Sequence, residues 1–74
     1  MARNATYPVE IGPLVPGDRH RHVRIERPGS PPVWEACASG ADLVAALTMF
    51  RPDLDLTDES QVHWVGSTGE WPKG

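Results

Sequence analysis

Cysteine and lysine are nearly absent from this chain, and its apolar runs are short. Because Cys37 is the single cysteine, the sequence excludes an intrachain disulfide and a zinc cluster of several cysteines. No apolar segment approaches the length of a transmembrane helix, which needs about 18 residues or more. The N-terminal sequence MARNATYPVE also lacks the hydrophobic core of a signal peptide. We therefore expect a cytoplasmic protein that does not span a membrane.

Sequence fingerprints of catalysis and cofactor binding are missing as well. The chain has neither a phosphate-binding loop nor a dinucleotide-binding glycine pattern. Nothing near Cys37 marks it as half of a nucleophilic Cys–His pair. His20 and His22 would face the same side of a strand, and His63 or a nearby carboxylate could complete a zinc site. Solvent-exposed histidines are the commoner meaning of such spacing. We predict no cofactor, no metal and no enzymatic activity.

The length and composition of the chain indicate one small globular domain. Its 74 residues leave no room for a second core, so we assign residues 1–74 to a single domain with a loose start at 1–5 and a tail at 70–74. Eight prolines and seven glycines predict a large share of loops. The net charge of −3 argues against a general nucleic-acid binder.

One α-helix is predicted from Ser39 to Phe50. The hydroxyl of Ser39 is a good N-cap acceptor, and Asp42 stands at the acidic position of a capping box three residues later. Leu43, Leu47 and Phe50 fall on one face at the helical period. The Arg-Pro pair that follows ends the helix, because a residue before proline disfavours helical geometry.

Strands are predicted on both sides of this helix. Apolar and polar residues alternate over 7–11, and the Pro-Gly-Asp sequence at 16–18 predicts a type II turn. A second strand is predicted at 19–27 and a third at 32–37, where an early helical turn is the alternative. The last strand is predicted at 61–65.

The apolar face of the helix must be buried, because a helix of three turns is not stable alone in water. We expect it to cover an inner sheet face made of Tyr7, Val9, Ile11, Val23, Ile25 and one side of 62–65. The arginines of the second strand are expected to lie outside this core, because its beginning has no apolar face.

These elements predict an α+β fold, with a mostly antiparallel sheet of three or four strands covered by one helix in the order ββ(β)αβ. The layout over roughly residues 6–70 resembles the ubiquitin-like β-grasp fold, above all at 52–69, where a proline and an acidic linker lead to QVHWVG and a glycine turn. The resemblance implies a fold and no activity. The last residues are Pro72-Lys73-Gly74 instead of the Gly-Gly end of conjugating and sulfur-carrying members, so a carrier or modifier role is not expected.

Charge and tryptophan suggest where a partner would bind. Arg and Trp are the residues that most often anchor protein interfaces, and so small a core cannot readily bury three Trp. The predicted partner-binding residues are Arg19, Arg21, Arg24, Arg27, Trp34 and Trp71. The predicted acidic surface consists of Asp53, Asp55, Asp58 and Glu59. The alternative is that the basic and acidic charges pair with one another within the fold and that Trp71 covers the edge of the core.

The function expected from these features is non-enzymatic protein binding. Size and composition fit an accessory or inhibitor protein of a phage or mobile element that occludes the surface of a partner. One alternative is a small nucleic-acid-binding or regulatory protein, in which the arginines of 19–27 contact phosphates and Trp34 or Trp64 stacks on bases. Another is a structural subunit of a larger assembly or a homo-oligomer.

Overall fold

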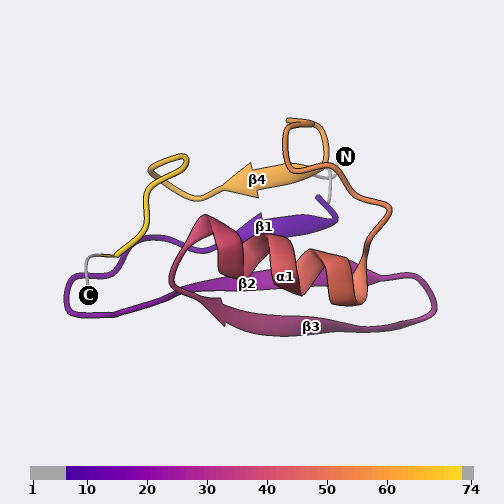
Figure 1. Ribbon diagram of the computed structural model, residues 1–74, viewed down its shortest axis with the longest axis horizontal. Coiled ribbons are helices and arrows are strands. Elements are labelled where there is room, and N and C mark those ends of the chain that lie inside the picture. Colours follow the sequence, from indigo (N-terminus) through magenta and orange to yellow (C-terminus); the bar gives the residue numbers. More distant parts are fainter. Residues whose placement is uncertain (1–6, 73–74) are drawn as a thin grey trace, which may run out of the picture.

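A computed structural model describes residues 7–72 as a four-stranded sheet with one helix across one face (Figure 1). The strands are β1 (Val9–Ile11), β2 (Arg21–Arg27), β3 (Ser30–Cys37) and β4 (Val62–Trp64), and the helix is α1 (Gly40–Phe50). Their order across the sheet is β3-β2-β1-β4, with β1 parallel to β4 and the other pairs antiparallel. The predicted α+β fold is confirmed.

The ends of the elements differ from expectation. β2 begins two residues later than predicted, and β3 begins two residues earlier, so residues 32–37 form a strand and not a helical turn. The turn between β1 and β2 is as predicted: the N–H of Asp18 donates to the carbonyl of Val15 at 3.0 Å, with Gly17 at φ 90°. The predicted loose start at 1–5 and the last two residues of the predicted tail lie outside the described residues.

Reciprocal hydrogen bonds fix the start of α1. The Ser39 hydroxyl accepts the N–H of Asp42 at 3.3 Å, and the Asp42 carboxylate accepts the N–H of Ala38 at 2.9 Å. The helix buries Leu43, Ala46 and Leu47. Within residues 7–72, no helix is long and apolar enough to cross a membrane.

The core lies between α1 and one face of the sheet. Its buried members come from the two central strands and are joined by residues of β3, β4 and the helix: Val9, Ile11, Val23, Ile25, Cys37, Leu43, Ala46, Leu47 and Val62. Tyr7 was predicted on this inner face, and that prediction is wrong. Its ring stacks on exposed His63 with centroids 5.0 Å apart, because the chain bends at Pro8 before β1 begins.

Candidate protein-binding site

The outer face of the sheet carries one row of side chains that crosses all four strands. The strand register places Trp34 beside Arg24, Arg24 beside Glu10, and Glu10 beside His63. Arg24 forms ion pairs with Glu10 at 3.3 Å and with Glu26 on its own strand. Trp34 is 62% exposed at the β3 end of the row. Because α1 lies across the opposite face of the sheet (Figure 1), no helix of the described residues covers this row.

Strand β3 forms one edge of the sheet, and its backbone groups that have no strand partner within residues 7–72 can be identified. The backbone N–H of Gly12 donates to the carbonyl of His22 at 2.8 Å, and the backbone N–H of Glu26 donates to the carbonyl of Pro8 at 2.8 Å. The backbone groups of these β2 residues therefore point toward β1, and those of the alternate β2 residues point toward β3. In β3, residues 33, 35 and 37 face β2 in this register, so Trp34 and Ala36 direct their N–H and C=O groups outward.

Prolines shorten the part of this edge that can pair with another strand. Pro31 and Pro32 have no N–H to donate and are common protection on edge strands. The outward donors that remain in β3 are the N–H groups of Trp34 and Ala36. The open edge is thus the segment 33–37.

A hollow borders this edge on the helix side of the sheet. It has a volume of about 310 Å³ between β3 and α1, and its walls include Glu35, Asp42, Ala45, Met49 and Phe50. Met49 is 74% exposed, which is the largest value among the exposed large hydrophobic residues. The edge therefore has an apolar side chain on each side of the sheet, Trp34 on the open face and Met49 on the helix face.

Arg21 does not lie on the surface, contrary to prediction. Its side chain is fully buried and donates to the carbonyls of Gly12 at 2.7 Å and of Val65, Ser67 and Glu70, each at 2.8 Å. These acceptors belong to the β1–β2 loop and to the segment after β4. Arg21 therefore ties two loops to the end of the sheet and is unavailable to a partner.

Arg21 also contacts an aromatic ring, and its burial affects its pKa. The guanidinium carbon lies 5.3 Å from the centre of the Trp64 ring, in cation–π geometry. Burial lowers the pKa of Arg21, and the negative charge of Glu70 acts in the opposite direction. The guanidinium stays protonated at any physiological pH. A charged group is thus satisfied inside the domain by carbonyl oxygens and an aromatic ring.

The other predicted arginines do not share one surface. Arg27 donates from Nε and Nη2 to the carbonyl of Pro31 at 3.1 and 3.0 Å, and its guanidinium lies 5.9 Å from the centre of the Phe50 ring. Arg19 is exposed in the loop before β2. Arg24 lies on the outer face of the sheet. Alternation separates Arg24 from Arg21, while Arg27 lies at the end of β2 and Arg19 precedes it, so the four arginines have different environments.

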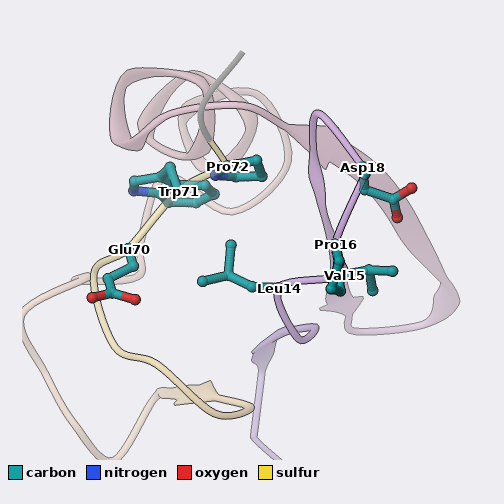
Figure 2. Close-up of a pocket in the computed structure, with 8 residues that line it drawn as sticks. Leu14, Val15, Pro16, Asp18, Glu70, Trp71 and Pro72 are labelled. Atoms are coloured by element: carbon teal, nitrogen blue, oxygen red, sulfur yellow. The ribbon is translucent and has the colours of Figure 1, made fainter.

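Trp71, predicted as a partner-binding residue, is half-buried. Its ring meets Trp64 edge to face with centroids 5.6 Å apart and packs against the core. It also lines a hollow of about 650 Å³ between the β1–β2 loop and the C-terminal segment. Figure 2 shows Leu14 pointing toward Trp71 and Pro72, while the carboxylate of Asp18 points away from them. Trp71 thus packs against Trp64 and the core, and it also lines this hollow.

Two of the predicted acidic residues are engaged by close neighbours in the loop after α1. Arg51 donates to both carboxylate oxygens of Asp53 at 3.0 and 2.9 Å, and this hydrogen bonding lowers the pKa of Asp53. Asp55 accepts the N–H of Thr57 at 2.9 Å and its hydroxyl at 2.7 Å, which lowers the pKa of Asp55. These carboxylates shape the loop as well as carrying charge.

The remaining acidic residues differ from each other. Asp58 accepts the N–H of Ser60 at 3.0 Å and its hydroxyl at 2.6 Å, which repeats the turn at Asp55. Glu59 is exposed. The acidic stretch is therefore largely a series of turns closed by side-chain oxygens.

Cys37 is buried at the end of β3. Burial raises the pKa of its thiol to about 11, with further contributions from the negative charges of Asp42 and Glu35. The thiol is protonated at neutral pH and is a poor nucleophile there. Among residues 7–72, no cluster of three His, Cys, Asp or Glu side chains is placed to hold a metal ion.

No protein family matches this chain, and neither the curated proteins nor the solved structures contain a significant match.

The structural features that sequence reasoning missed are the open segment 33–37 and its neighbour Met49. A signal for Met49 exists, since it lies off the apolar face of the helix. The exposure of the edge has no local signal, because it depends on which strands pair.

Proposed function

We propose that this protein is a non-enzymatic binding module that pairs the edge of β3 with an extended segment of a partner protein. The observation that carries the proposal is that the outward backbone groups of Trp34 and Ala36 have no strand partner among residues 7–72, with exposed Trp34 and Met49 on either side. Strand addition gains affinity from main-chain hydrogen bonds and specificity from alternate side chains. By binding a strand of the partner protein, this protein would cover part of the partner's surface. That fits the role of an accessory or inhibitor protein of a phage or mobile element.

The arrangement of the arginines gives less support to nucleic-acid binding. Phosphate contacts require several cations on one accessible surface. Arg21 is buried, and Arg24 is flanked by the carboxylates of Glu10 and Glu26. The β3 edge is therefore the surface on which the proposal rests.

Ala36→Pro tests the proposal directly. This change removes an N–H that points outward, so it leaves the ladder to β2 intact and blocks a strand added outside. Ala36→Thr is the matched control, because it alters the side chain at the same exposed position and keeps the donor. We expect affinity capture from a lysate of the source cells to recover a partner with the wild type and Ala36→Thr, and to fail with Ala36→Pro.

Two further measurements make the experiment decisive. Nuclease treatment of the lysate should leave capture unchanged, because the partner is a protein. Amide hydrogen exchange should show protection of Trp34 and Ala36 only when the captured partner is bound. Equal capture by the proline variant, or loss of capture on nuclease treatment, would contradict the proposal.

A further inference from the structure

The hollow beside β3 indicates the chemistry of the segment that binds there. In an antiparallel pair, residues directly opposite each other project from the same face of the sheet. The partner residue opposite Glu35 therefore projects toward α1, into the hollow that Glu35 and Asp42 line together with Met49 and Phe50. Within residues 7–72, neither carboxylate takes part in an ion pair.

From this geometry we infer that the β3 edge selects an extended segment with lysine or arginine opposite Glu35. The aliphatic stem of such a side chain would lie along Met49 and Phe50, and its charged end would reach Glu35 and Asp42. Opposite charges facing each other across two strands are favourable, and like charges are unfavourable. The inference rests on the proposed function, because it specifies what that site binds.

The negative charges of Glu35 and Asp42 also affect Cys37. Cys37 lies beside the hollow, and the charges of both Glu35 and Asp42 contribute to the raised pKa of its thiol. The two carboxylates therefore act on the same small region.

The same geometry disfavours a second copy of this chain as the occupant. A symmetric antiparallel pair uses both outward donors of each copy only when Trp34 of one copy lies opposite Ala36 of the other. That register places Glu35 opposite Glu35 across the two-fold axis. A shift that relieves this contact brings Pro32, which has no N–H, or Ala38, whose N–H already donates to Asp42, into the pairing. The edge thus favours a different chain with a basic residue at this position.

Two matched peptides test the inference. The probe acetyl-TVTKTVT-amide places lysine at the centre of a symmetric alternating strand, and acetyl-TVTETVT-amide differs only in that residue. Binding is followed through the backbone amide shifts of Trp34 and Ala36 in an NMR titration. We expect the lysine peptide to bind the wild type about three- to tenfold more tightly than the glutamate peptide.

Charge reversal separates a local contact from general attraction to an acidic protein. Glu35→Lys should reverse the preference, so that the glutamate peptide binds more tightly. Glu59→Lys is the matched control, because it changes the net charge equally at an exposed loop residue and should leave the preference unchanged. Equal binding of both peptides to the wild type, or a lysine preference that survives Glu35→Lys, would overturn the inference while leaving strand addition in place. Failure of both peptides to shift the amides of Trp34 and Ala36 would overturn the proposed function together with the inference.

Discussion

The two faces of the sheet use arginine from the same strand in opposite ways. Arg21 projects from the covered face and is enclosed, with four carbonyl acceptors from two distant loops. Arg24 stands three residues later on the open face and pairs with Glu10 and Glu26 near solvent. The comparison shows that a basic strand need not be a binding surface, because alternation sends every second side chain into the domain.

The largest expected effect is the loss of stability on removing Arg21, for which removal of Arg24 is the comparison. Arg21→Ala should lower the free energy of unfolding by about 3 kcal/mol or more, because it removes a fully buried side chain together with its hydrogen bonds to four carbonyls. Arg24→Ala should lower it by no more than about 1 kcal/mol, because its ion pairs lie near water. Urea denaturation followed by circular dichroism measures both.

Arg21→Lys sharpens this first test. Lysine keeps the charge but cannot reproduce the planar set of donors that reaches four carbonyls. It should therefore fall between the wild type and Arg21→Ala. If Arg21→Ala and Arg24→Ala denature at the same urea concentration, the difference drawn here between the faces is wrong.

A smaller effect is expected at the covered end of β3 when the pH is raised. The pKa of Cys37 rises from 9.0 to about 11 in the folded protein, so the thiol ionises more readily after unfolding. The resulting stability is complete below pH 9.0 and is lost as the pH rises toward about 11. The loss should amount to about 2–3 kcal/mol.

Cys37→Ala provides the control for this pH dependence. The variant is expected to start from lower stability, because it leaves space in the core, but its stability should change less between pH 8 and pH 11 in the same urea experiments. Equal slopes for the two proteins would show that the thiol does not titrate differently on folding.

The smallest effect is expected on the open face. Trp34→Ala should change the free energy of unfolding by no more than about 0.5 kcal/mol, because the ring is largely exposed. Trp64→Ala should lower it by about 3 kcal/mol, because that ring packs on the core and over Arg21. Thermal unfolding compares the two variants. A large loss for Trp34→Ala would mean that the open face contributes to folding and is not reserved for a partner.

Local sequence patterns predicted the secondary structure well. The N-cap at Ser39, the buried positions Leu43 and Leu47, and the turn at Gly17 all depend on residues within a few positions of each other. The division of β2 into two faces was also predictable, since side chains alternate along any strand. What failed was the placement of Arg21 outside the core. Alternation puts its side chain on the same face as Val23 and Ile25, but the beginning of the strand was expected to extend past the core.

The sequence by itself determined the elements of this protein, because capping, turn chemistry and periodicity act over a few residues. Only the tertiary structure decided what each face of the sheet does. Arg21 finds three of its acceptors 44 to 49 residues away, and it is satisfied only after β4 has paired with β1. Among the described strands, β3 likewise stands at an edge because β4 pairs with β1 on the other side of the sheet. The pairing of distant strands depends on the total free energy of the folded chain, so it cannot be predicted from any short stretch of sequence.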